Sequence, residues 1–218
     1  MNISHRLKKK IHHLHKKHKL HHRTIFYMRK GKNLHFHARI IKESIKILIL
    51  ASLISTIGGI GLQTLQQKLV EIIPLLILLP ALNHMTGSLG TIVSSRFATD
   101  LYLGKVTKSW WKSKIVNNLL KSIMKIAFIT SFYISILSAA ISVYRGFPVD
   151  MLLFLKILLI TLATTTIIVS IVFFISVIGG IYIYSKKKDP NNFLIPLTTS
   201  VADLGSMVVY SVMILILI

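Results

Sequence analysis

The chain has 218 residues, of which 53% are hydrophobic, and its mean hydropathy is +0.67. This composition is too apolar for a soluble domain and indicates an integral membrane protein. The formal net charge is +21, and the absence of cysteine excludes disulfides and thiolate metal sites.

The first element is a basic, His-rich tail, residues 1–38, which holds all but one of the ten histidines. One interpretation is a solvated anchor whose Lys and Arg side chains contact anionic lipid head groups. A second is a regulatory metal sensor, because three- and four-residue spacings place His15, His18 and His22 near one helical face. Charge alone could also attract nucleic acid. The tail has no recognisable nucleic-acid-binding fold and no aromatic stacking array, so we expect no nucleic-acid partner.

Five apolar segments follow the tail, and each is long enough to cross a bilayer, which requires about 20 residues. They cover residues 40–62, 69–98, 115–143, 151–184 and 193–218. Lysines concentrate between the second and third segments and between the fourth and fifth, and basic loops favour the cytoplasm. We therefore predict an all-α membrane protein of the plasma membrane. Residues 39–218 would form five transmembrane helices, with the N-terminus inside and the C-terminus outside.

The second apolar segment has an unusual composition for a spanning helix. It contains Pro74 and Pro80, and beyond them Asn83, Gly87 and Gly90. Proline inside a helix removes a hydrogen bond, and irregular backbone at membrane depth requires a protein or water-filled surrounding. We expect a kinked or broken helix beside a polar site, as in many transporters. The alternative is a proline-kinked span that is packed by small residues.

The last apolar segment contains a single acid, Asp203, about ten residues or roughly 15 Å beyond Phe193. That depth is close to the bilayer midplane, where a carboxylate is costly and by default marks a functional site. Thr199, Asp203 and Ser206 recur at helical spacing and so share one face. Alternatively, Asp203 is a protonated carboxyl group that bonds across helices, or a cap within a broken helix.

Asn83 and Gly87 lie on a matching polar stripe of the second segment. Amide, hydroxyl, carbonyl and carboxylate oxygens are hard ligands, which suit magnesium and calcium. Small residues at this position would also leave room for a hydrated ion. We therefore expect a divalent-cation pathway between the second and last segments.

Two stretches of the chain also carry a family resemblance. The first consists of Pro74-Leu75-Leu76, Asn83, Ser95-Arg96-Phe97-Ala98-Thr99 and Gly104. The second consists of Asp189-Pro190-Asn191-Asn192, Pro196-Leu197-Thr198-Thr199 and Asp203-Leu204. At these residues the chain resembles the MgtE-type magnesium transporter and channel family, in its membrane domain only, without the N-terminal and CBS domains of bacterial members.

The resemblance implies a homodimer that transports Mg2+ through a pore at the subunit interface. Asp203 of each subunit would face the hydrated ion, and Asn83 would line the same region. From the polar stripes described above, we expect Thr199 and Gly87 to line the pore as well. Ser206 would be an accessory residue. Two carboxylates that share a site repel each other when it is empty, and a divalent cation relieves that repulsion.

Two residues near this site leave the choice of ion and its entry route open. The family's Gly-Gly-Asn appears here as Ala81-Leu82-Asn83, and His84 follows it. A histidine ligand would favour a transition-metal transporter for zinc, cobalt or nickel, whereas a hydrogen-bonding His84 would not. Glu71 either attracts cations to the pore mouth or is a solvated interfacial acid.

A different class of function is a membrane-anchored interaction protein that recruits a partner through its basic tail. Catalysis is not expected, because the sequence contains no recognisable Ser/His/Asp, paired-carboxylate or HExxH arrangement.

Overall fold

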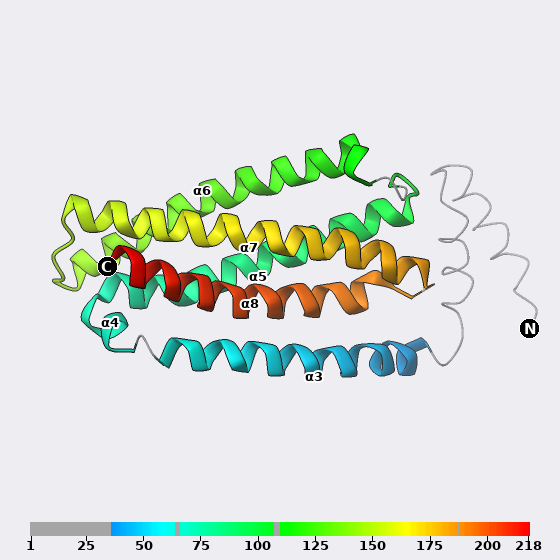
Figure 1. Ribbon diagram of the computed structural model, residues 1–218, viewed down its shortest axis with the longest axis horizontal. Helices are drawn as coiled ribbons and strands as arrows, with labels where there is room; N and C mark the ends of the chain where they lie inside the picture. Colours follow the sequence, from blue (N-terminus) through cyan, green and yellow to red (C-terminus); the bar gives the residue numbers. More distant parts are fainter. Residues whose placement is uncertain (1–35, 64–65, 107–109, 187) are drawn as a thin grey trace, which may run out of the picture.

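The computed structural model describes residues 36–63, 66–106, 110–186 and 188–218, and these residues form helices and no strands (Figure 1). The α-helices are α3 (Phe36–Gln63), α4 (Gln66–Glu71), α5 (Ile73–Tyr102), α6 (Lys114–Tyr144), α7 (Met151–Ser185) and α8 (Pro190–Leu217). A short 3₁₀ helix, η1 (Trp110–Lys112), precedes α6. The metal sensor expected at His15, His18 and His22 lies outside the described residues.

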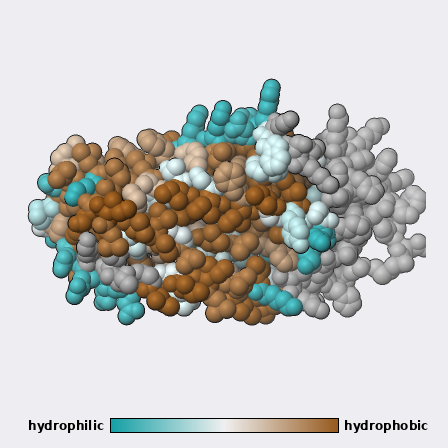
Figure 2. Space-filling model, in the orientation of Figure 1, coloured by the Kyte–Doolittle hydropathy of each residue, from teal (hydrophilic) through white to brown (hydrophobic). Residues whose placement is uncertain are grey.

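Four helices of the described chain, α5, α6, α7 and α8, are long and apolar enough to cross a membrane. The first predicted segment corresponds to α3, in which the strongly apolar part, Ser44–Ile60, is shorter. Apolar side chains cover most of the visible face of the molecule (Figure 2). The protein is therefore a multi-pass membrane protein, and its described residues include four helices of spanning length.

Helices α5, α6, α7 and α8 pack against one another, whereas α3 lies along α8 at the edge of the bundle (Figure 1). The contact between α3 and α8 is close at Gly58, where an added Cβ would lie 3.0 Å from Leu204 Cα. A glycine at this position lets the two backbones approach. Helix α3 is thereby held beside the middle of α8.

The second predicted segment is interrupted, but the interruption lies ahead of the polar patch and not beside it. The chain bends at Ile72, between α4 and α5, and α5 then continues without interruption through Pro80. Pro74 lies in the first turn of α5, where a backbone N–H has no partner within the helix in any case. Pro80 costs α5 one hydrogen bond, and packing against three long helices maintains the helix around it. Asn83 and Gly87 therefore lie on regular helix.

Buried hydroxyl groups connect three of the spanning helices. Ser94 of α5 lies 2.9 Å from the Ser176 hydroxyl of α7 and 3.0 Å from the Thr198 hydroxyl of α8. All three side chains are fully buried. Hydrogen bonds between spanning helices fix how the helices are positioned along and around their axes. These bonds therefore set the axial position of α5 relative to α8.

The start of α8 is also held in place by polar contacts. The Asp189 carboxylate accepts hydrogen bonds from the backbone N–H of Asn191 at 3.0 Å and from the Tyr102 hydroxyl at 2.8 Å. A carboxylate at this position satisfies a free N–H of the first turn. Asp189 therefore anchors the beginning of α8 to the end of α5.

Candidate functional site

Asp203 lies near the midpoint of α8, roughly 20 Å from either helix end. Its side chain is half-buried. The Ser55 hydroxyl of α3 donates a hydrogen bond to Asp203 Oδ2 at 3.2 Å. Asp203, the single acid of α8, therefore has a polar partner on a neighbouring helix at membrane depth.

On the α5 side, Asn83 lies next to Asp203 and Ser206. The Ser206 hydroxyl donates to Asn83 Oδ1 at 2.5 Å and is 3.0 Å from the backbone carbonyl oxygen of Asp203. Ser206 thus links the Asn83 amide to the backbone of Asp203. Two of the expected residues of α8 and one of α5 therefore meet in a single polar cluster.

Gly87 lies one turn further along α5, and it leaves space beside the same carboxylate. A Cβ added at Gly87 would lie 3.6 Å from Asp203 Oδ1 and 3.4 Å from Thr199 Cγ2. The Thr199 hydroxyl is 3.3 Å from that of Thr91 and donates to the Ile195 carbonyl at 2.9 Å. Asn83, Gly87, Thr199 and Asp203, which were predicted as pore-lining residues, thus lie together at the interface of α5 and α8.

The cluster offers one carboxylate surrounded by neutral oxygen atoms. They come from the Asn83 amide and from the hydroxyl groups of Ser55, Thr199 and Ser206. Within the described ranges, no group of three or more His, Cys, Asp and Glu side chains could enclose a metal ion. Such a donor set suits an ion that keeps much of its own water shell.

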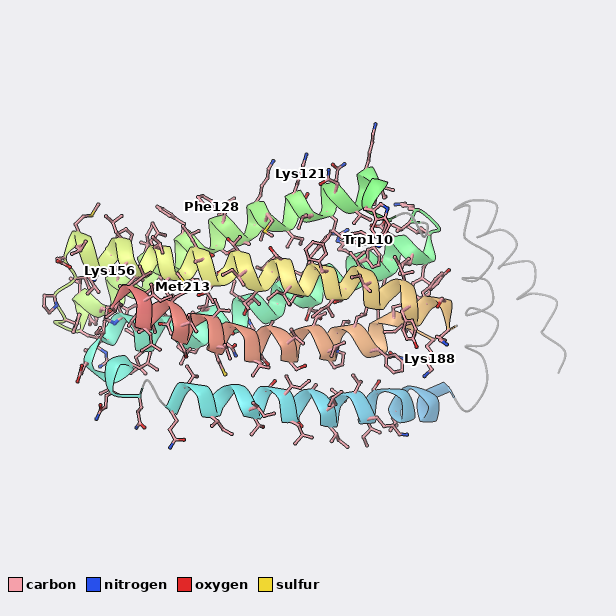
Figure 3. The ribbon with its side chains drawn as sticks, viewed as in Figure 1. Trp110, Lys121, Phe128, Lys156, Lys188 and Met213 are labelled. Atoms are coloured by element: carbon pink, nitrogen blue, oxygen red, sulfur yellow. The ribbon has the colours of Figure 1, made fainter. Side chains whose placement is uncertain are left out.

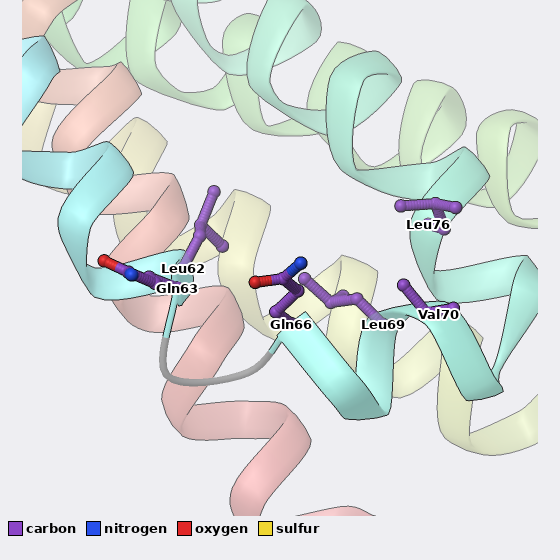
Figure 4. Close-up of a pocket in the computed structure, with 6 residues that line it drawn as sticks. All are labelled: Leu62, Gln63, Gln66, Leu69, Val70 and Leu76. Atoms are coloured by element: carbon purple, nitrogen blue, oxygen red, sulfur yellow. The ribbon is translucent and has the colours of Figure 1, made fainter.

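Two of the accessory residues lie apart from this cluster. The His84 side chain is exposed, although its neighbour Asn83 faces Ser206, because successive helical residues differ in direction by about 100°. Glu71 is exposed at the end of α4 and lines a shallow hollow with Gln66, Gln67 and Val70. Beside it lies a largely apolar hollow of about 270 Å³ between α3, α4 and α5, whose lining residues Figure 4 shows.

Ser55 was not expected from the sequence. Ser52 and Thr56 flank it on α3, and their hydroxyls bond to carbonyl groups of the same helix. Only Ser55 of these three reaches another helix. A usable signal is that Ser55 and Gly58, one helical turn apart, share a face, because small residues at an interface let helices approach closely.

The sequence matches the model of the MgtE family, described as divalent cation transporters, over residues 79–213. The match begins within α5, includes α6 and α7, and ends within α8, so it contains both Asn83 and Asp203. No curated protein and no solved structure is significantly similar to the chain. Since the match covers more than half of the chain, the protein belongs to the MgtE family of divalent cation transporters.

Proposed function

We propose that the transported ion is Mg2+, and that it passes the cluster around Asp203 with much of its hydration shell in place. The observation that carries this proposal is a half-buried carboxylate near the middle of α8 with neutral oxygen atoms of α3 and α5 near it. Mg2+ dehydrates reluctantly and prefers oxygen ligands, often through its own waters. One carboxylate and several neutral oxygens support that mode of binding.

The position of His84 favours Mg2+ over a transition metal. Zinc, cobalt and nickel sites in proteins usually use imidazole nitrogen. His84 is exposed, and it points about 100° around the helix from Asn83, which faces Ser206. The cluster around Asp203 offers oxygen atoms alone among the residues that the structure describes.

We further propose a homodimer in which the two copies of Asp203 face the ion across the subunit interface. Paired carboxylates would repel each other in an empty pore, and a divalent cation would neutralise them. Helix α3 would be a fifth span, with the basic tail in the cytoplasm and the C-terminus outside the plasma membrane. The start of α6 and the end of α7 are rich in lysine and lie at the same end of the bundle, and basic ends favour the cytoplasm.

Transport by the Asp203→Asn variant tests the proposal. Asparagine preserves shape but removes the charge, so Mg2+ flux into proteoliposomes that contain a Mg2+-sensitive dye should be abolished. Asp150→Asn is the matched control, because Asp150 is an exposed carboxylate that caps the start of α7 by accepting from the Leu153 N–H at 2.9 Å. Wild-type flux through a well-folded Asp203→Asn protein would refute a role of this carboxylate.

A further inference from the structure

The outward face of α6 changes its chemistry along the helix. Its first part carries three exposed lysines among exposed amide and hydroxyl side chains, and its next part carries exposed aromatic and aliphatic ones. The polar residues are Lys114, Asn117, Asn118, Lys121, Ser122 and Lys125. The apolar residues include Phe128, Ile129, Phe132 and Tyr133, which are 59%, 66%, 44% and 62% exposed. Lys121 and Phe128 point away from the bundle along this edge (Figure 3), and hydrophilic side chains rise from it in Figure 2.

The length of the apolar part places the lysines at a membrane boundary. No charged residue occurs between Ile126 and Tyr144, a stretch of roughly 28 Å in a helix. A bilayer core is about 30 Å thick, so this stretch fills it. Lys125 is then at the edge of the core, and Lys121 is one turn further out, within the head-group layer. Trp111, which is 71% exposed, lies just before α6, in keeping with the enrichment of Trp at membrane interfaces.

The two lysines have no acidic neighbour along the chain and no ion pair among the described residues. The sequence contains no Asp or Glu between Leu101 and Val149. The ion pair nearest in the chain joins Lys105 to Asp100 at 3.6 Å, and Lys121 and Lys125 form none with the described residues. Residues four apart on a helix lie side by side, about 6 Å apart, which is a separation that one phosphate group can bridge. Since the described residues supply no such anion, the lysine pair is open to one from outside the chain.

We propose that this face of α6, residues Lys121, Lys125, Phe128, Ile129 and Phe132, binds an anionic phospholipid of the surrounding bilayer. The phosphate lies between the two lysines, and an acyl chain follows the exposed apolar residues toward the middle of the membrane. An acidic peptide or a nucleic acid would match the lysines but would leave the adjoining aromatic side chains without a partner. In a phospholipid, the charged head group matches the lysines and the acyl chain matches the apolar residues that follow them along α6.

Native mass spectrometry of the purified full-length chain tests the proposal. The chain is titrated with phosphatidylglycerol and with phosphatidylcholine of identical acyl chains, and soluble glycerol phosphate serves as a head-group probe. Lys121→Gln/Lys125→Gln removes the pair. The matched control is Lys186→Gln/Lys188→Gln, which removes two charges at the same end of the bundle, between α7 and α8.

The wild-type chain should prefer phosphatidylglycerol. Each lysine near the surface contributes roughly a fivefold factor in affinity, so the α6 double variant should lose about 25-fold and the control should lose none. Lys121→Arg/Lys125→Arg should retain binding, which separates charge from folding. Equal binding of both lipids, equal losses in both Gln variants, or equally tight binding of glycerol phosphate would each overturn the proposal.

Discussion

Ser55 connects α3 to the carboxylate that we propose as the ion site. Replacing Ser55 with Ala removes the 3.2 Å hydrogen bond that orients Asp203. Loss of one such bond costs about 1 kcal/mol, so Mg2+ flux in proteoliposomes should fall roughly fivefold, while Ser55→Thr should keep most of it. Ser52→Ala is the control, because the Ser52 hydroxyl bonds to the Ile49 carbonyl of its own helix. Equal flux in the two Ala variants would contradict the role of Ser55.

Gly87 determines how much space is left beside Asp203 Oδ1. An added methyl group would make ordinary contacts, at 3.4 Å to Thr199 Cγ2 and 3.6 Å to Asp203 Oδ1, so the fold should tolerate it. Alanine also stabilises a helix by roughly 0.5–1 kcal/mol relative to glycine. We therefore expect Gly87→Ala to retain or raise the melting temperature and to lower Mg2+ flux. Gly59→Ala, which meets no atom within 4 Å, is the control and should leave flux unchanged.

Helical periodicity grouped Thr199 and Ser206 with Asp203 on one face of the last helix, but it could not select Ser55. Period identifies which residues of one helix share a face, and so Thr199, Asp203 and Ser206 could be grouped. Ser55 is 148 positions away from Asp203 on a different helix. Its role depends on the rotation and height of α3 against α8, and these follow from packing at Gly58. Such packing is a tertiary property, and the local pattern shows only that Ser55 and Gly58 share a helical face.

At the scale of the helices, the hydroxyl groups of Ser94, Ser176 and Thr198 provide a second test. Ser94→Ala removes both contacts between helices, at 2.9 and 3.0 Å. Ser176 and Thr198 keep backbone acceptors on their own helices, so the cost should be moderate, about 1 kcal/mol. Thermal unfolding in detergent measures it. The neighbouring Ser95→Ala removes only a bond within α5, to the Thr91 carbonyl, and an equal or larger loss there would contradict the argument.

Hydropathy predicted the long helices well because each contains an apolar stretch long enough to span a membrane. The expected segments 115–143 and 151–184 correspond to α6 and α7 with ends that differ by one residue at most. The second segment differs more, since α4 and α5 divide at Ile72, before the polar patch. Composition identified proline as a helix breaker, but its effect depends on position. Pro74 falls in a first turn that accepts it, and Pro80 falls where neighbouring helices hold α5 together.

At the scale of the whole molecule, the described chain has one carboxylate at the proposed site, and a second would have to come from another copy. A pore between two subunits and a pore within one subunit then respond differently to mixing. If wild-type and Asp203→Asn subunits assemble at random in equal amounts, a dimeric pore that needs both carboxylates retains about one quarter of its activity. A pore within each subunit retains about one half.

Mg2+ flux in proteoliposomes, measured across a series of mixing ratios, distinguishes a quadratic from a linear decline. Mixing with Asp150→Asn subunits should leave the flux unchanged, because that exposed carboxylate serves only the first turn of α7. A linear decline with Asp203→Asn would place each ion path within one subunit and would remove the physical reason for pairing the two carboxylates.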